Sequence, residues 1–326
     1  MSASELPTEL RLALDWELWV IEQLLFETKL DDIVGTLVAQ GVERGLARAR
    51  VLDIRRSEGF ARLERRLGEA RLAAKLQRLQ AELAPEQQLA VRETIDRDTL
   101  LAEHWIRSRP LLLTDAVQHM RAVREWSLAE LARRFPTAEI EVNVERLAAT
   151  RVADTETRAR TMTLPELVAL AEAAASNDFY VVSRNGLLSH PELRPLWDEL
   201  TPLPDFLAPL QPPNGASLWV GPAGTVTPPH FDPHNVLLVQ VQGRKRIRLA
   251  PRVRAPLHAS LSGYYLSEPL EQVFEPAAIY EVTLEPGHAL FVPVAWFHEV
   301  TALAPSITLS FLHFRWPNHF HWLAPR

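Results

Sequence analysis

Apolar residues recur at helical spacing near the start of the chain, over residues 8–28. This spacing of three to four residues predicts an amphipathic helix whose apolar side covers a broad arc. The residues of this arc are Leu10, Leu14, Trp16, Leu18, Trp19, Ile21, Leu25 and Phe26. Because so much apolar surface is unstable in water, the N-terminal helices either fold back onto the rest of the chain, pair with a second copy or dock another protein. We favour a homodimer, since a twofold interface lets one patch cover itself.

Two further helices are predicted before residue 90. One spans 33–40, with Asp31 or Asp32 as its N-cap and Gly41 at its end. The other is an arginine-rich stretch over 58–83 that stops before a proline. The sequence therefore predicts an N-terminal helical region over residues 1–90.

The pattern changes after about residue 91, where short apolar segments replace the long helical stretches. A helix is predicted over 98–107, and the segments Ser127-Leu-Ala-Glu130 and Thr163-Leu-Pro-Glu166 are capping boxes that open two more. The predicted strands, most of them bounded by turn residues, are 109–113, 139–145, 179–183, 217–220, 236–242, 245–250, 279–284, 289–292 and 307–314. Many short strands between turns are typical of a sandwich or barrel, so residues 91–326 are predicted to form one mainly β domain with additional helices.

The composition is that of an ordinary globular chain. The 326 residues are 47% hydrophobic and carry a net charge of −6, so no global positive field attracts nucleic acid or anionic lipid, and neither is expected as a partner. The chain has no cysteine, which excludes disulfide frameworks, thiolate nucleophiles and iron–sulfur clusters. Any metal must therefore be bound by His, Asp or Glu. The first residues form no apolar signal segment and no membrane span is visible, so a cytoplasmic protein is expected.

Positive charge is concentrated in residues 43–80. Ten arginines and one lysine stand there against five acids, which makes this span +6 and the rest of the chain −12. A basic face for an acidic partner is one interpretation, and a solvated helix whose arginines and glutamates pair at i,i+3 and i,i+4 is the other. We favour the solvated helix, because aromatic residues do not interleave the basic ones as they do in proteins that bind single-stranded nucleic acid.

The stretch with the clearest chemistry contains His230 and Asp232. On a strand, residues two apart point to the same face, so these two side chains can meet one ion inside a barrel. His298 closes the apolar segment that begins at Phe291 and is the candidate third ligand. Two imidazoles and one carboxylate leave three metal positions open, which is the arrangement of non-haem Fe(II) oxygenases. The alternative is a surface turn together with an unrelated core histidine.

Three linked motifs follow one another in the second half of the chain. They are Trp219-Val-Gly-Pro-Ala-Gly-Thr-Val-Thr-Pro-Pro-His-Phe-Asp232, Gln242-Gly-Arg-Lys-Arg-Ile-Arg-Leu-Ala-Pro251 and Glu285-Pro-Gly-His-Ala-Leu-Phe-Val-Pro-Val-Ala-Trp-Phe-His298. In this order they resemble the JmjC, cupin-like family of Fe(II)- and 2-oxoglutarate-dependent oxygenases, over about residues 92–318. The chain looks most like bacterial members and the hydroxylase-type branch that includes the asparaginyl hydroxylase acting on hypoxia-inducible factor. The resemblance implies a double-stranded β-helix, or jelly roll, with helices packed outside.

The resemblance assigns roles to individual residues. His230, Asp232 and His298 match the iron ligands, and Thr227 and Lys245 match the residues that hold the far carboxylate of 2-oxoglutarate. Independently of the family, a dicarboxylate inside a barrel needs a buried counter-charge, which Lys245 can supply. The alternative for this lysine is an exposed position in a basic run.

Three further residues match positions around the co-substrate. Tyr180 matches a tyrosine whose hydroxyl reaches the same carboxylate, and Ser310 matches a small polar residue beside the co-substrate. Trp219 matches an aromatic residue that lines the substrate pocket. Core packing is the alternative explanation for Tyr180 and Trp219.

The sequence also departs from the family pattern. Relatives often have an asparagine six residues after the first ligand, but this position is Val236 here and Asn235 is one residue earlier, so a polar contact to the co-substrate is missing or shifted. Few residues follow the last strand, so the C-terminal dimerisation helices of some relatives are not expected. Five further histidines, interpreted as rim or core residues, are His234, His288, His313, His319 and His321.

Taken with its resemblance, the chain is expected to be an oxygenase that uses Fe(II), 2-oxoglutarate and O2. The first choice of reaction is hydroxylation of a C–H bond in a protein or peptide side chain. Hydroxylation of a small metabolite or natural product, N-methyl demethylation and a non-catalytic cupin-like binding module are the alternatives. The loops over 202–213 and 252–275 are expected to border the pocket and to set specificity.

Overall fold

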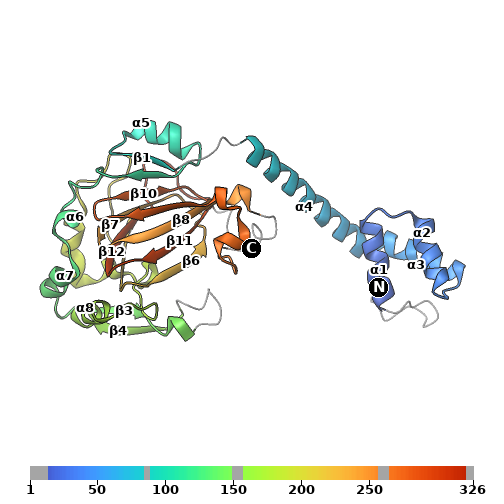
Figure 1. Ribbon diagram of the computed structural model, residues 1–326, viewed down its shortest axis with the longest axis horizontal. Coiled ribbons are helices and arrows are strands. Elements are labelled where there is room, and N and C mark those ends of the chain that lie inside the picture. Colours follow the sequence, from blue (N-terminus) through green and yellow to red (C-terminus); the bar gives the residue numbers. More distant parts are fainter. Residues whose placement is uncertain (1–13, 84–88, 149–156, 256–263, 321–326) are drawn as a thin grey trace. The chain divides into compact units, whose positions relative to one another are not determined.

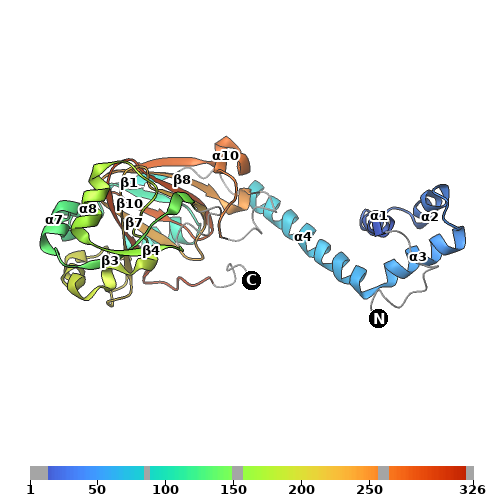
Figure 2. The same cartoon turned by 90° about the horizontal axis from the view of Figure 1, so that it is seen from below.

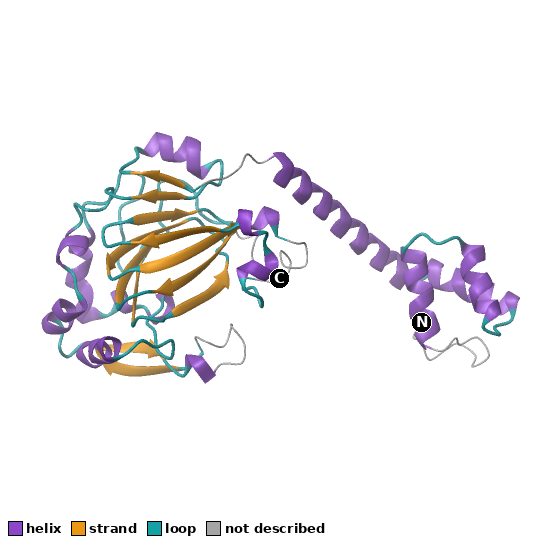
Figure 3. Ribbon diagram, in the orientation of Figure 1, coloured by secondary structure: helices purple, strands orange, loops and turns teal. Residues whose placement is uncertain are grey.

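The structure is a computed structural model that describes residues 14–83, 89–148, 157–255 and 264–320, without the side chains of 14, 72–74 and 76–83. The chain divides into two compact units, residues 1–80 and 81–326. The first unit contains helices, drawn in purple in Figure 3, and the strands, drawn in orange, belong to the second unit.

The first unit is helical. Its helices are α1 (Leu14–Leu25), α2 (Leu30–Ala39), α3 (Arg44–Arg56) and α4 (Glu58–Leu83), the last of which continues past residue 80. The side chains that form its core are Val20, Ile33, Val34, Leu37, Ala47, Val51, Ile54 and Phe60. Of the predicted apolar arc, Trp16, Trp19, Ile21 and Leu25 pack against this core, while Leu18 and Phe26 keep exposed fractions of 51% and 74%. Leu10 lies outside the described residues.

The homodimer stays a prediction, and it now depends on this smaller apolar surface. We expect light scattering of the full chain to give a dimer mass. We expect the double variant Leu18→Glu with Phe26→Glu to be a monomer, because two carboxylates would have to be buried in the interface. A monomeric wild-type chain would contradict the prediction.

The ends of α2 match the sequence prediction in part. Gly41 follows the helix with φ +91°, a backbone conformation that favours glycine, as predicted. The N-cap, however, is Lys29, whose side chain makes no capping hydrogen bond, so the prediction of an aspartate cap was wrong. Asp31 and Asp32 lie inside the first turn instead, where their negative charge interacts favourably with the positive end of the helix dipole.

In the described part of the span 43–80, two arginines make the local pairs expected of a solvated helix, and three make pairs with acids that precede the span. Arg62 pairs with Glu58 at i,i+4, and Arg50 pairs with Asp53 at i,i+3. The exposed Arg62 pair contributes little to stability. The Arg50 side chain is only 12% exposed and also pairs with Glu17 of α1.

The second unit is built on two main β-sheets. The larger sheet has the strand order β1-β2-β10-β7-β12-β5, and its strands are β1 (Ala90–Arg92), β2 (Leu111–Leu113), β5 (Ala216–Gly221), β7 (Val236–Gln242), β10 (Ala289–Val292) and β12 (Ser306–Phe311). The smaller sheet has the order β6-β11-β8-β9, and its strands are β6 (Val226–His230), β8 (Lys245–Pro251), β9 (Tyr280–Leu284) and β11 (Trp296–Ala302). All neighbours except β1 and β2 are antiparallel. This is the jelly-roll core that the sequence predicted.

Side-chain alternation fixes which face of β8 turns inward. Lys245, Ile247 and Leu249 are fully buried, whereas Arg246 and Arg248 alternate with them and keep some exposure. Arg248 forms ion pairs with Glu299 of the neighbouring strand β11 and with Glu271 of the helix Leu270–Val273. Because a strand has a period of two, burial of the two aliphatic residues carries Lys245 into the interior with them.

Helices cover the outside of the second unit. They are α5 (Arg97–Thr99), which continues as a π-helical turn (Leu100–Trp105), α6 (Arg121–Glu125), α7 (Leu128–Arg134), α8 (Leu164–Ala173), α10 (Leu270–Val273) and the 3-10 segments Arg146–Ala148, Ser183–Asn185, Leu187–Ser189, Pro191–Leu200, Arg252–Arg254 and Pro276–Ala278. A separate two-stranded sheet joins β3 (Glu139–Asn143) to β4 (Ala159–Thr163). Figures 1 and 2 place α7 and α8 at one end of the main sheets and α10 at the other. No described helix is both long enough and apolar enough to span a membrane.

One buried ion pair links α7 to the 3-10 segment Pro191–Leu200 on the outside of the unit. The carboxylate of Glu199, 5% exposed, accepts two hydrogen bonds from Arg134 and one from the indole of Trp126. The Arg134 guanidinium holds the pKa of Glu199 below its usual range. This cluster stabilises the fold and does not line the site described below.

Some predicted elements differ in the structure. Residues 179–183 form only isolated bridges, at Tyr180 and Val181, and not a full strand. The Thr163 capping box is complete, but only half of the Ser127 box forms because the Glu130 carboxylate pairs with Arg133.

Two strands of the small sheet were not predicted. The strand β6 contains two prolines, which are tolerated because it lies at the edge of its sheet and needs fewer ladder hydrogen bonds. The strand β11 follows β10 after a tight turn in which Ala295 has φ +60°. In the sequence β10, this turn and the start of β11 read as one apolar run.

Candidate functional site

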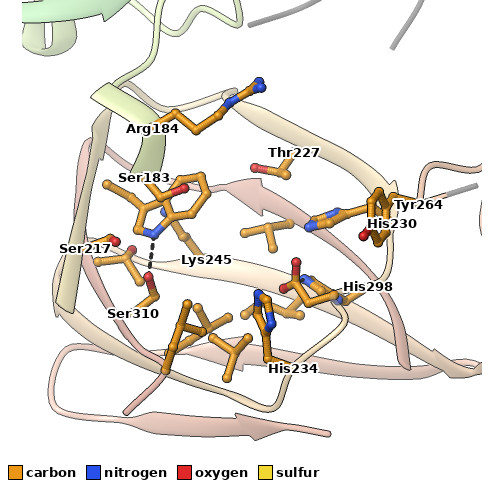
Figure 4. A pocket seen from close by; sticks show the side chains of 18 of the residues that line it. Ser183, Arg184, Ser217, Thr227, His230, His234, Lys245, Tyr264, His298 and Ser310 are labelled. Atoms are coloured by element: carbon orange, nitrogen blue, oxygen red, sulfur yellow. Dashed lines mark hydrogen bonds and ion pairs between the residues drawn. The ribbon is translucent and has the colours of Figure 1, made fainter. Parts of the chain in front are cut away.

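A cavity of about 360 Å³ lies inside the jelly roll. Strands β6, β8 and β11 of the small sheet and β5, β7 and β12 of the large sheet contribute to its walls. All eight residues singled out from the sequence line it: Tyr180, Trp219, Thr227, His230, Asp232, Lys245, His298 and Ser310. Figure 4 shows His230 and His298 toward one end and Ser217, Ser310 and Lys245 toward the other.

The end of the cavity that contains His230 and His298 is formed where β6 and β11 pair. His230 is the last residue of β6 and lies opposite His298 in the register of the two strands. Asp232 lies two residues beyond the end of β6, in the loop, so the prediction that it shares a strand face with His230 was wrong. The loop nevertheless returns its carboxylate to the histidines, and one donor atom from each of the three residues lies within 4.8 Å of the others.

The distances within this group fit ligands of one ion. His298 Nε2 and Asp232 Oδ2 are 3.7 Å apart, too far for a hydrogen bond. With metal–ligand bonds of about 2.0–2.2 Å, two ligands of the same ion lie about 3 to 4 Å apart. The ring centroids of His230 and His298 are 4.1 Å apart. The donor set is therefore nearly arranged for a metal.

Backbone carbonyl groups orient both imidazoles. His230 Nδ1 lies 2.8 Å from the carbonyl oxygen of Pro228, and His298 Nδ1 lies 3.1 Å from that of Trp296. A carbonyl only accepts, so each Nδ1 carries the proton and each Nε2 keeps a lone pair for a metal. Burial, and then the nearby His230, lower the pKa of His298 to about 4. At neutral pH His298 is therefore a neutral ligand that need not release a proton to bind a metal.

A β-bulge brings Thr227 into the same cavity. In the pairing of β6 with β11, His230 is opposite His298 and Thr227 is opposite Val300, so three steps along β6 match two along β11. Without the extra residue, positions 227 and 230 would face opposite sides of the sheet. The bulge lets both side chains line the cavity.

Lys245 is a buried cation, with an exposed fraction of 3%. Its Nζ donates a hydrogen bond to the hydroxyl of Tyr180 at 3.0 Å. In the part of the chain that the structure describes, no carboxylate lies within 4 Å of this ammonium group. The interpretation of Lys245 as an exposed residue of a basic run is therefore wrong. A buried ammonium group that contacts a phenol and, among the described residues, no carboxylate can bind an anionic group.

Aromatic packing supports the same end of the cavity. Tyr180 is 2% exposed, and its ring centroid lies 5.9 Å from that of Trp219. The Trp219 indole donates a hydrogen bond to Ser310 Oγ at 2.9 Å, the dashed line in Figure 4. The Ser310 hydroxyl keeps its own proton to donate into the cavity. Trp219 therefore both packs against Tyr180 and lines the cavity.

The departure at position 236 has a structural explanation. Val236 lines the cavity with an apolar side chain, whereas Asn235 does not line it. Asn235 Oδ1 accepts a hydrogen bond from the amide of Val294, and its Nδ2 donates to Asn318. Asn235 therefore fixes the turn before β11, and the polar contact common in relatives is missing from position 236.

Several lining residues were not singled out from the sequence. They are Ser183, Arg184, Ser217, His234, Tyr264, Tyr265 and Thr308, along with aliphatic residues. His234 was interpreted as a rim or core histidine, and it is a wall residue here. Of the two loops expected to border the pocket, 252–275 contributes its two tyrosines, and no described residue of 202–213 lines this cavity. His321 lies outside the described residues.

The residues present fit a divalent metal together with a dicarboxylate. Two imidazole nitrogens and one carboxylate oxygen are ligands that suit Fe(II) and leave open positions. Asp232 and Lys245 carry opposite single charges, and a divalent metal and a dicarboxylate carry opposite double charges. The loaded cavity would therefore be close to neutral, as burial of four charges requires.

Comparison with known proteins agrees with this geometry. The cupin-like domain family matches residues 97–260, which is half of the chain, and the JmjC domain family matches residues 203–321. The chain belongs to the cupin-like, JmjC family. Enzymes of this family use Fe(II), 2-oxoglutarate and O2, and the His230, Asp232 and His298 group could hold the metal.

Characterised relatives carry several different names. Lysine-specific demethylase 8 of Xenopus tropicalis is 28% identical over 222 residues, which are 63% of this chain and 48% of the relative. Lysine-specific demethylase JMJ30 of Arabidopsis thaliana is 26% identical over 264 residues, 73% of this chain and 58% of the relative. The tRNA wybutosine-synthesizing protein 5 of Danio rerio is 27% identical over 238 residues, 64% of this chain and 70% of the relative. The chain spans about half the length of the first two relatives.

Proposed function

We propose that the protein is an Fe(II)- and 2-oxoglutarate-dependent oxygenase. The observation that carries this proposal is the placement of His230, Asp232 and His298 in one cavity with the buried Lys245. The metal ligands alone would suit many reactions. A buried cation in the same cavity adds a receptor for a co-substrate with a second, distant carboxylate.

In this proposal each described side chain has a physical task. Fe(II), when bound, supplies the activation of O2, so that one oxygen atom enters the substrate and the other enters succinate as 2-oxoglutarate loses CO2. Lys245, Tyr180 and Thr227 hold the far carboxylate and thereby orient the co-substrate relative to the ligands. The aliphatic side chains of Val236 and Ile247 exclude water from the part of the cavity between the metal ligands and Lys245.

For the substrate, we propose a protein or peptide side chain that becomes hydroxylated. Among the described residues that line the cavity, Asp232 is the only carboxylate, and it is a proposed metal ligand. A methylated lysine or arginine would therefore have no free counter-charge there, which supports a neutral target over N-methyl demethylation. Two relatives are named lysine-specific demethylases, so demethylation stays the second candidate. A small metabolite is the third.

Turnover of 2-oxoglutarate tests the class of function. The purified full chain with Fe(II) and O2 should convert 2-oxoglutarate to succinate slowly alone and faster with a substrate. If the protein binds the metal and yet forms no succinate under any condition, it is a non-catalytic cupin-like module. Mass spectrometry of a defined peptide mixture then separates the substrate classes. Hydroxylation adds one oxygen atom to the peptide, whereas demethylation removes a methyl group and releases formaldehyde.

A further inference from the structure

Arg146 is a buried arginine behind the carboxylate end of the cavity. It follows β3 in a short 3-10 turn and has an exposed fraction of 3%. It does not line the cavity itself. Its guanidinium group contacts the two chain segments that present Thr227 and Tyr180, so it can affect the site only through those residues.

The first of these contacts fixes the start of β6. Arg146 Nη2 donates a hydrogen bond to the carbonyl of Val226 at 2.9 Å, and Nη1 donates to Asn177 Oδ1 at 2.8 Å. The same Asn177 oxygen accepts a hydrogen bond from the amide of Val226 at 2.8 Å. Both polar groups of the Val226 backbone are therefore bound by this pair of side chains. The next residue is Thr227.

The second contact fixes Tyr180. The guanidinium carbon of Arg146 lies 5.2 Å from the centroid of the Tyr180 ring, and Lys245 Nζ lies 5.4 Å from the same centroid. Two backbone hydrogen bonds between Asn143 and Tyr180 hold the tyrosine beside the end of β3, three residues before Arg146. The ring therefore contacts two cations, and its hydroxyl reaches the lysine.

We propose that Arg146 is a positioning residue for the far carboxylate of 2-oxoglutarate. It acts through Tyr180 and Thr227, and it needs the planar fork of an arginine to bind Val226 and Asn177 while it packs on a ring. The proposal rests on the proposed function, because it assumes that this end of the cavity receives the carboxylate. It adds a residue that neither the motifs nor the cavity lining indicated.

The test is the affinity of the full chain for 2-oxoglutarate, measured by calorimetry with Mn(II) as the metal. Arg146→Gln should weaken 2-oxoglutarate binding about tenfold, because the hydroxyls of Tyr180 and Thr227 each lose part of a hydrogen bond. Mn(II) affinity should not change. In turnover with Fe(II), KM for 2-oxoglutarate should rise about as much while kcat stays within about twofold. Arg146→Lys keeps the charge without the fork and should not restore the affinity.

Two further variants separate positioning from general stability. Arg134→Gln removes a structural arginine of the same unit, and it should lower the melting temperature without changing 2-oxoglutarate affinity. Asn177→Ala removes the other side chain that binds Val226, so it should weaken 2-oxoglutarate binding selectively even if the Arg146 variants do not fold. Affinity equal to wild type in the folded Arg146→Gln or Asn177→Ala variant, or full recovery in Arg146→Lys, overturns the positioning role. Wild-type protein that binds Mn(II) but no 2-oxoglutarate refutes the proposed function instead.

Discussion

Replacement of His298 by alanine should abolish metal-dependent turnover and leave the fold intact. His298 is buried, neutral at neutral pH and opposite His230, so its loss removes one of three ligands and leaves no charge unpaired. Changes to residues that only support a ligand lower metal affinity or activity by about 10–100-fold. Loss of the ligand itself should exceed the upper end of that range. Asp232→Ala should behave alike, because Asp232 is the only anionic ligand.

The measurement pairs Fe(II) or Mn(II) affinity with succinate formation, and circular dichroism reports the fold. His288→Ala is the matched control, since His288 lies in the same unit and does not line the cavity. It should bind metal and turn over as the wild type does. If folded His298→Ala retained wild-type metal affinity, His298 would not be a ligand.

Loss of the charge on Lys245 should act on the co-substrate and leave the metal bound. Lys245→Met keeps much of the side-chain volume, so the main change is removal of a buried cation. Loss of one partner of a desolvated ion pair costs about 2–5 kcal/mol, which corresponds to a fall in 2-oxoglutarate affinity of about one to three decades. Titration of 2-oxoglutarate into the Mn(II)-loaded variant measures this directly.

Arg244→Met is the control for this variant. Arg244 is the exposed neighbour of Lys245 in the same basic run, and its replacement should leave the affinity for 2-oxoglutarate unchanged. If the two variants bound 2-oxoglutarate equally well, the buried lysine would not be the carboxylate receptor. The proposed function would then lose its main support.

Much of the site could be predicted because its chemistry is local in sequence. The spacing of His230 and Asp232 and the apolar segment before His298 named three candidate ligands, and the family resemblance assigned them to one metal site, the group that the structure brings together. The alternation along β8 carries Lys245 inward and needs no long-range information. These features depend on the period of a strand and on the unusual position of charged residues beside apolar ones.

Other features could not be predicted because they depend on tertiary pairing. Whether the two prolines of β6 allow a strand depends on its place at the sheet edge, and the β-bulge that turns Thr227 inward exists only against β11. The role of Asn235 depends on Asn318, far away in the sequence. Arg146 has no motif, and its contacts come from segments about 30 and 80 residues further along the chain.

The most direct test of the central claim is a crystal structure of the full chain with Mn(II) and N-oxalylglycine, an unreactive analogue of 2-oxoglutarate. We expect one metal ion bound by His230, Asp232 and His298. We expect the far carboxylate of the analogue to contact Lys245, within reach of the hydroxyls of Tyr180 and Thr227. A metal ion bound elsewhere, or an analogue whose far carboxylate does not reach Lys245, would contradict the central claim.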